Sequence, residues 1–346
     1  MKTIPLGQTD IHVSQLCLGS MTWGTQTSEA GGHAQMDMAL EAGINFIDTA
    51  EAYPVNPMNK ENAGKTEAII GNWFEARKNR DKVVLATKCA GAGNFIRDGE
   101  EISGRVIHEA IDGSLKRLKT DYIDLYQLHW PNRGSYMFRQ NWTYDPSKQD
   151  KAKTRAHMED VLGALQTEVE RGRIRAFGLS NESAWGTCQW LDVAAQMGGP
   201  RVETIQNEYS LMCRMYDTDL GELGHNEQIT LLAFSPLATG LLTGKYQGGA
   251  VPEGSRASIG PTLGGRMSER ALPGAQVYLD VAEKHGLDPV HMALAFCNQR
   301  PFPVSPIFGA TTSEQLKHII DGKDLVLSQE VLDDLNAANR SFPMPY

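Results

Sequence analysis

The stretch that decides the fold is residues 83–128, VVLATKCAGAGNFIRDGEEISGRVIHEAIDGSLKRLKTDYIDLYQL. Its two ends, Val83–Thr87 and Ile123–Leu128, are apolar runs of strand length. Between them, apolar residues from Val106 to Leu118 recur at the i, i+3, i+4, i+7 spacing of one helix face. A strand, a helix and a second strand in this order predict two parallel strands joined by a helical crossover.

The same unit recurs along the whole chain. Further strands are expected at Gln15–Leu18, Asn45–Ile47, Ala176–Leu179, Thr204–Gln206, Thr230–Phe234 and Val304–Phe308. Further helices are expected at Ala34–Leu40, Glu67–Ala76, Met158–Val169, Cys188–Met197, Val277–His285 and Gln315–Ile320. Eight strands that alternate with helices predict a (β/α)8 TIM barrel. The alternative is an open doubly wound sheet, but its G-x-G-x-x-G fingerprint follows none of the strands.

Three segments lie outside this alternation. Lys2–Pro5 and Ile11–Val13 flank a turn sequence and predict a β-hairpin over the bottom of the barrel. Pro131–Lys153 is polar and aromatic, and Gly240–Pro273 is rich in glycine. Both are long for plain connections, which favours functional loops. Because each falls inside the alternation, we expect a single domain over residues 1–346.

The composition is that of an ordinary soluble globular protein. The 346 residues carry 33 Lys+Arg and 42 Asp+Glu, a net charge of −9. This acidic balance argues against a nucleic-acid or membrane surface as partner. The five cysteines are scattered, and the first residues lack the apolar stretch of a signal peptide. We therefore expect free thiols and a cytoplasmic protein, for which a homo-oligomer is compatible with the sequence.

Chemistry gathers where three successive strands end. Asp48 and Tyr53 follow the second strand, Lys88 follows the third, and His129 follows the fourth. Active sites of TIM barrels lie at the carboxyl ends of the strands. A single Asp, His or Lys at a strand end is usually structural, but four such side chains at one rim favour an active site.

The four residue types together make a proton donor. A free tyrosine titrates near pH 10, too high for efficient proton transfer at neutral pH. An ammonium about 4 Å away contributes about 4 kcal/mol at an effective dielectric constant near 20. We therefore expect Lys88 to lower the pKa of Tyr53 toward neutrality, Asp48 to hold Lys88, and a neutral His129 to orient a carbonyl oxygen.

The site lacks an electron source of its own. No H-E-x-x-H motif exists, and no ligand spacing relates the remaining histidines, which include His108, His157, His225, His285, His291 and His318. No metal site is therefore expected. A carbonyl group beside a phenol donor instead suggests that a cofactor delivers hydride.

These motifs resemble the aldo-keto reductase superfamily, above all its bacterial Tas-type and potassium-channel β-subunit-like branch. The resemblance rests on the segments GINFIDTA at residues 43–50, DYIDLYQLH at 121–129 and GLSN at 178–181. It implies a (β/α)8 barrel that binds NADP(H) and reduces aldehydes and ketones. It also implies that Tyr53 is the general acid, with Asp48, Lys88 and His129 completing a tetrad. The channel relatives differ at the histidine, so His129 favours a working enzyme.

The resemblance also implies the cofactor contacts. Ser180, Asn181 and Gln206 would bind the nicotinamide amide, Phe234 would stack on the ring, and Lys245 and Arg256 would meet the 2′-phosphate of NADPH. Two solvated loop cations are the alternative for the last pair. The remaining implied contacts are Ser20, Met21, Asp48, Ser235, Pro236, Leu237, Ala238, Gly240, Gly309, Thr311 and Gln315.

The chain departs from the family pattern at the adenine end. Relatives usually have a Glu-Asn pair there, and this chain has His318-Ile319. The isoleucine cannot form a hydrogen bond, so weaker adenine binding or a weaker preference for NADPH is expected. Gly240–Tyr246 superficially resembles a P-loop, but its spacing is one residue short and Tyr246 replaces the required Ser or Thr.

Aromatic residues are expected at the mouth of the site. Trp23, Tyr53 and Trp130 would line it, which favours an apolar or planar carbonyl compound. Phe138, Trp142 or Tyr144 would close over it from the long loop, or else pack against the barrel or a partner subunit.

Two other functions compete with a carbonyl reductase. One is a slow-turnover, NADP(H)-binding redox-sensing subunit. The other is a Schiff-base lyase or aldolase that uses Lys88 as nucleophile, which requires a depressed lysine pKa. Asp48 beside Lys88 opposes such a depression.

Overall fold

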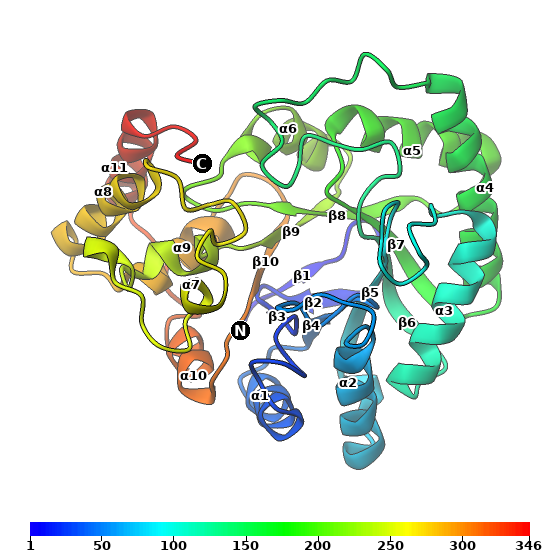
Figure 1. The fold of residues 1–346 in the computed structure, drawn as a ribbon, viewed down its shortest axis with the longest axis horizontal. Coiled ribbons are helices and arrows are strands. Elements are labelled where there is room, and N and C mark those ends of the chain that lie inside the picture. The colour runs from blue at the N-terminus through cyan, green and yellow to red at the C-terminus, as the bar shows by residue number, and fades with distance from the viewer.

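The computed structural model describes residues 1–346, and its centre is a closed barrel of eight parallel strands (Figure 1). Around the barrel the order is β10-β3-β4-β5-β6-β7-β8-β9. The strands are β3 (Cys17–Gly19), β4 (Phe46–Asp48), β5 (Val84–Cys89), β6 (Ile123–Leu128), β7 (Ile174–Ser180), β8 (Val202–Glu208), β9 (Thr230–Phe234) and β10 (Val304–Phe308). Each expected strand is present, and the (β/α)8 barrel is confirmed.

Helices surround the barrel (Figure 1). They are α1 (Glu29–Glu41), α2 (Lys65–Arg77), α3 (Gly104–Leu118), α4 (Lys151–Glu170), α5 (Ala184–Met197), α6 (Asp219–Asn226), α7 (Arg256–Ile259), α8 (Ala271–Lys284), α9 (Pro289–Asn298), α10 (Ser313–Asp321) and α11 (Gln329–Ser341). Short 3-10 turns occupy Arg80–Lys82, Met215–Asp217, Ala238–Thr243 and Gln247–Gly249. All seven expected helices are present, and four others (α6, α7, α9 and α11) were not predicted.

The omission of α9 has a clear physical cause. Seven of its residues are buried, including the consecutive run from Met292 to Cys297. A helix buried on all sides has no polar face and therefore lacks the periodic pattern that reveals a surface helix. The helix expected at Val277–His285 lies in α8, which packs against α11, whereas α9 contacts β10 (Figure 1).

The N-terminal hairpin closes one end of the barrel, as predicted. Strands β1 (Thr3–Pro5) and β2 (His12–Ser14) pair antiparallel, with Ile4 opposite Val13. Leu6, Ile11 and Val13 pack with barrel side chains such as Phe46 and Leu125 in a small apolar cluster. This end of the barrel is therefore filled, and a substrate can enter only from the other end.

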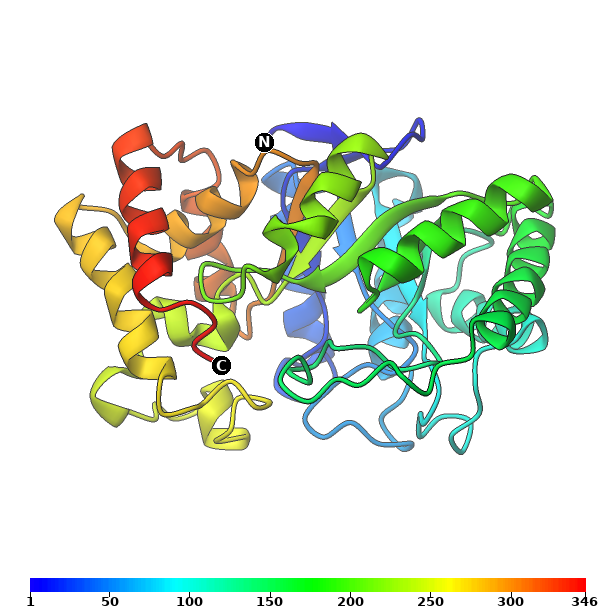
Figure 2. The ribbon, with the colours of Figure 1, turned by 90° about the horizontal axis from the view of Figure 1, so that it is seen from above.

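The long loops lie at the opposite end of the barrel from the hairpin (Figure 2). The first loop was expected at Pro131–Lys153 but ends at Asp150, three residues earlier. Asp150 caps α4 by accepting from the backbone N–H of Lys153 at 3.0 Å. The second contains two 3-10 turns and α7 before α8 begins at Ala271. No helix in the structure has both the length and the apolar character needed to cross a membrane.

Candidate active site

The four side chains of the expected tetrad meet at the open end of the barrel. Lys88 is fully buried in β5, and its ammonium lies 2.6 Å from Oδ2 of Asp48 at the end of β4. The same ammonium donates to the carbonyl oxygen of Thr49 at 2.7 Å and lies 3.4 Å from the Tyr53 hydroxyl. The ring of His129 stands edge-on to Tyr53, with centroids 5.8 Å apart.

Two amide side chains hold the carboxylate of Asp48 from across the barrel. Gln206 donates to its Oδ1 at 2.9 Å and Gln127 at 3.3 Å, and Gln206 also donates to Gln127 at 3.1 Å. Both come from strand interiors, where rotamers are fixed by packing. The carboxylate, and through it the ammonium of Lys88, is therefore held in one orientation.

The loop that carries Tyr53 is fixed by a buried ion pair. Glu51 accepts from the backbone N–H of Ala90 at 2.7 Å and pairs with Arg97 at 2.6 Å. These contacts join the loop after β4 to the loop after β5. The phenol of Tyr53 is thereby placed beside Lys88.

The pKa of Tyr53 is raised in the isolated chain. Burial has the largest effect, and the nearby ammonium of Lys88 lowers the pKa but does not offset it. The expected lowering of this pKa is therefore wrong, because the sequence could not show how strongly the hydroxyl is desolvated. The phenol remains protonated at neutral pH, as a proton donor requires.

Lys88 and His129 have opposite protonation states. Burial alone would lower the pKa of Lys88, but the negative charge of Asp48 and the interactions with Asp48 and Tyr53 outweigh it and raise the value. Burial, followed by the charge of Lys88, holds the pKa of His129 well below its usual value. The ammonium is thus charged and the imidazole neutral, and a charged lysine is a poor nucleophile for Schiff-base chemistry.

Residues at the ends of β7 and β8 fit the amide of a nicotinamide ring. Asn181 donates to the carbonyl oxygen of His129 at 2.9 Å, but its own buried Oδ1 has no partner. Ser180 donates to the backbone oxygen of Gln206 at 2.9 Å. An unsatisfied buried acceptor is costly, and a carboxamide N–H2 is a group that would satisfy it.

The segment after β9, where the pyrophosphate contacts are expected, turns sharply. Phe234 ends the strand half-buried, and positive φ angles follow at Ser235 (56°), Ala238 (48°) and Gly240 (99°). This segment also contains Pro236 and Leu237. A Cβ at residue 240 would lie 2.7 Å from Cε of Lys245, so glycine lets that side chain fold back here.

The two cations expected at the 2′-phosphate lack carboxylate partners. Arg256 is half-buried, and its Nε and Nη1 lie 3.0 Å and 2.8 Å from the side-chain amide of Asn56, whose oxygen accepts from both when the amide is turned toward them. Burial, with a smaller effect of Arg266, lowers its pKa. Lys245 is exposed, and its ammonium lies 5.2 Å from the ring centroid of Tyr246. Both cations are therefore free to meet an anion.

The remaining cofactor contacts fall at two places. Ser20 is buried and donates to the backbone oxygen of Asp48 at 2.7 Å, and Met21 follows it half-buried. At the start of α10, Gln315 accepts from Thr311 at 3.0 Å and 3.1 Å, just after Gly309. His318 is half-exposed near the end of α10, and Ile319 is buried against the core. The structure thus leaves no polar group of residue 319 for adenine.

The mouth of the site differs from the expectation at Trp23. Trp23 is fully buried, donates from its indole N–H to Gln35 at 3.0 Å and lies against Gly32. A substrate cannot reach this ring, so Trp23 supports the wall from behind. Trp130 is half-buried beside His129, with ring centroids 4.9 Å apart.

One of the three loop aromatics reaches the mouth. Phe138 stands edge-on to Trp130, with centroids 6.4 Å apart. Tyr144 instead packs against Tyr136, and Trp142 is 64% exposed. The loop therefore approaches the site through Phe138.

Sequence reasoning missed a charged cluster at the rim. Glu208, at the end of β8, pairs with Arg266 at 2.7 Å and with Arg139 at 3.0 Å. The two arginines come from the two long loops, so Glu208 joins both loops to the barrel. The sequence did contain one indication that Glu208 belongs to the site. Glu208 lies two residues after Gln206, and alternate residues of a strand share a face.

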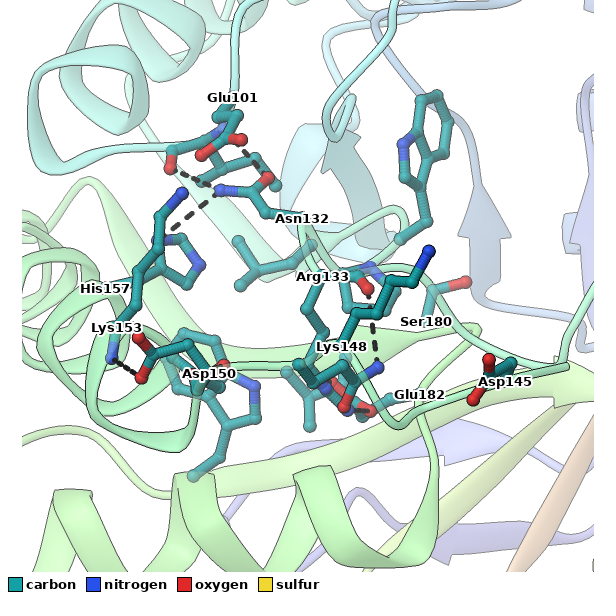
Figure 3. A pocket seen from close by; sticks show the side chains of 18 residues that line it. Glu101, Asn132, Arg133, Asp145, Lys148, Asp150, Lys153, His157, Ser180 and Glu182 are labelled. Carbon is teal, nitrogen blue, oxygen red and sulfur yellow. Dashed lines mark hydrogen bonds and ion pairs between the residues drawn. The ribbon is translucent and has the colours of Figure 1, made fainter.

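A cavity of about 290 Å³ lies between β6, β7 and the start of α4 (Figure 3), and none of the tetrad residues lines it. Trp130 and Ser180 line one side, and Lys148 and Lys153 lie on its polar side. Arg133 pairs with Glu182 within it. Its lining includes several residues of the first long loop and none of the glycine-rich loop.

The fold and the site agree with comparisons to known proteins. The model of the aldo/keto reductase family matches residues 15–340. The chain belongs to the aldo/keto reductase family. This family implies an NADPH-dependent oxidoreductase activity.

Several relatives cover almost the whole chain. It is 42% identical over 342 residues to Protein tas of Escherichia coli strain K12, covering 97% of this chain and 96% of that protein. It is 32% identical over 336 residues to the uncharacterized oxidoreductase YrpG of Bacillus subtilis, covering 96% and 94%. It is 29% identical over 352 residues to a probable voltage-gated potassium channel subunit beta of Oryza sativa, covering 98% and 96%.

Proposed function

We propose that this aldo/keto reductase reduces aldehydes or ketones to alcohols, with Tyr53 as the proton donor. The observation that carries the proposal is the contact of a protonated phenol with a buried, charged Lys88. NADPH, when bound, would supply the hydride. The residues of the chain then have to orient a carbonyl group and deliver one proton to its oxygen.

The carbonyl oxygen would lie between Tyr53 and His129. A neutral imidazole can donate a hydrogen bond to this oxygen without competing for the proton. As negative charge develops on the oxygen, the phenol transfers its proton, and the ammonium of Lys88 stabilises the phenolate that remains. Asp48 keeps Lys88 charged and in place throughout.

The cofactor contacts belong to the same proposal. The unpaired Oδ1 of Asn181 supports a carboxamide at this position, with Ser180, Gln206 and Phe234 as its proposed neighbours. Lys245 and Arg256 would neutralise the 2′-phosphate, because neither has a carboxylate partner. This pairing would distinguish NADPH from NADH.

A titration followed by a substrate screen tests the proposal. Tryptophan fluorescence is measured while NADPH or NADH is added, and NADPH consumption is then followed with a panel of aldehydes and ketones. We expect tighter binding of NADPH and turnover with at least one apolar or planar carbonyl compound. Absence of binding by either nucleotide would contradict the proposal.

A second candidate is a slow-turnover NADP(H)-binding subunit with a regulatory role. The name of the rice relative, a probable channel subunit, favours it. Rapid oxidation of bound NADPH in a single turnover, followed by very slow steady-state turnover, would support this candidate. Equal rates in both experiments would support the enzyme. The cytoplasmic location expected from the free thiols stays a prediction.

A further inference from the structure

A cluster of three potential metal ligands lies outside the candidate active site. Asp288 caps the start of α9, His291 lies in the first turn of this helix, and His318 lies in the last turn of α10. One ligand atom from each lies within 4.8 Å of the others. His291 and His318 are 27 residues apart, so their spacing gave no metal signal in the sequence.

The ring of His291 is held with one nitrogen free. Its Nε2 lies 2.6 Å from the backbone oxygen of His318 and must donate to it. In the neutral ring, Nδ1 then carries the lone pair that a metal requires. Metal-binding histidines characteristically donate their second N–H to a carbonyl or carboxylate in this way.

Gly322 makes this position of the ring sterically available. A Cβ at residue 322 would lie 2.1 Å from Cγ of His291. Any other residue there would displace the imidazole. The ring is therefore fixed both by a hydrogen bond and by the shape of the neighbouring backbone.

Asp288 turns its second carboxylate oxygen toward His318. Its Oδ1 accepts from the backbone N–H groups of Val290 and His291 at 2.9 Å and 3.0 Å. Its Oδ2 lies 3.1 Å from Nε2 of His318. The nearby carboxylate of Asp321 is paired with Lys317 at 2.7 Å, which leaves Asp288 as the acidic ligand of the cluster.

We propose that Asp288, His291 and His318 bind Zn²⁺, with water completing the coordination. Two imidazole nitrogens and a carboxylate oxygen are donors that zinc prefers. Tetrahedral zinc at its usual bond lengths separates its ligands by about 3.3 Å. The contact of Asp288 with His318 is already close to this spacing, whereas Nδ1 of His291 lies 3.9 Å from Oδ1 of Asp288. The rings of His291 and His318 are stacked, with centroids 4.7 Å apart, so the side chain of His318, 48% exposed, has to turn for both rings to face one ion. The ion would join α9 to α10.

The alternative is an ion pair between Asp288 and a protonated His318, without metal. Calorimetric titration with ZnCl2 separates the two, using chelator-treated protein without a histidine tag. The exposed Cys188 is replaced by Ser in every variant, because its thiol is another potential ligand. CoCl2 serves as a second probe, since cobalt in a tetrahedral site absorbs visible light.

We expect one equivalent of Zn²⁺ to bind. His318→Ala should weaken binding by at least the roughly 10–100-fold that loss of an outer-shell partner costs. Asp288→Asn should also weaken binding, while its amide still caps α9. His225→Ala is the matched control, because His225 is exposed on α6 and outside the cluster; it should bind as the parent does. No binding in the parent, or equal binding in the His318 and His225 variants, would overturn the proposal.

Discussion

The tetrad and the two long loops lie at the same open end of the barrel, and they are built differently. Around Asp48 and Lys88, charged groups are buried and paired with side chains from barrel strands. The loops have paired arginines too, Arg139 and Arg266 on Glu208. Beyond this cluster, however, Lys245 is exposed, Arg256 has no carboxylate partner and Trp142 is 64% exposed. The difference indicates that the barrel fixes the chemistry, while the loops are available for binding.

The strongest test of this comparison is Tyr53→Phe. Removing the proton donor should lower turnover by about 10²–10⁴, the usual contribution of a general acid. Steady-state kinetics with an aldehyde substrate measures this change. NADPH affinity should stay the same, because the hydroxyl belongs to the chemical side of the site. Full activity with unchanged nucleotide binding would show that another group donates the proton.

Lys88→Met tests the stability of the buried side. The substitution leaves the carboxylate of Asp48 buried without its cation, which should destabilise the protein by about 3–5 kcal/mol. Urea unfolding measures the loss. Lys60→Met is the matched control: Lys60 pairs with Asp98 on the surface, with side chains 60% and 85% exposed, so at most about 1 kcal/mol should be lost. Equal losses in the two variants would refute the comparison.

The raised pKa of Tyr53 predicts different pH dependences for the two reaction directions. Reduction uses the protonated phenol and should persist until the pH approaches this raised pKa. Alcohol oxidation uses the phenolate, whose fraction rises about tenfold per pH unit below the pKa. Initial rates between pH 6 and about 10 should therefore rise for oxidation and not for reduction. A maximum near neutral pH for oxidation would contradict this assignment.

Arg256→Gln tests the loop side. Loss of a charged contact with the 2′-phosphate should cost about 1.5–3 kcal/mol, roughly a 10–150-fold weaker affinity for NADPH. Affinity for NADH should not change. Arg105→Gln removes the same charge from α3, where Arg105 pairs with Glu109, and serves as the control. If both nucleotides lose affinity equally, Arg256 does not recognise the 2′-phosphate.

The smallest effects are expected for the loop aromatics. Phe138→Ala removes an edge contact with Trp130. The KM of an apolar carbonyl substrate should rise by the factor that corresponds to a loss of about 0.5–1.5 kcal/mol of binding free energy. Trp142→Ala should change KM and stability by less than about 0.5 kcal/mol, because the side chain is mostly exposed. Larger effects of Trp142 would place that residue in the binding surface.

The sequence predicted the barrel and the convergence of the tetrad because strand ends in a (β/α)8 barrel meet at one rim. It could not predict the pairing of Glu208 with Arg139 and Arg266, since these partners come from irregular loops with no periodic pattern. The prediction that Trp23 lines the mouth was wrong for a related reason. Its position after a strand did not reveal that its ring turns into the protein interior. The pKa of Tyr53 depends on desolvation, which only the packed structure shows.

The way the barrel closes has a consequence for folding. The last strand, β10, pairs with the first, β3, so that Ile307 lies beside Cys17. Contacts so far apart in the chain raise the contact order, and closure has to wait until nearly all of the polypeptide has been synthesised. Until then, β3 and β9 are open edges able to pair with other chains. A polypeptide truncated before Val304 should therefore accumulate as aggregates rather than as a smaller folded protein.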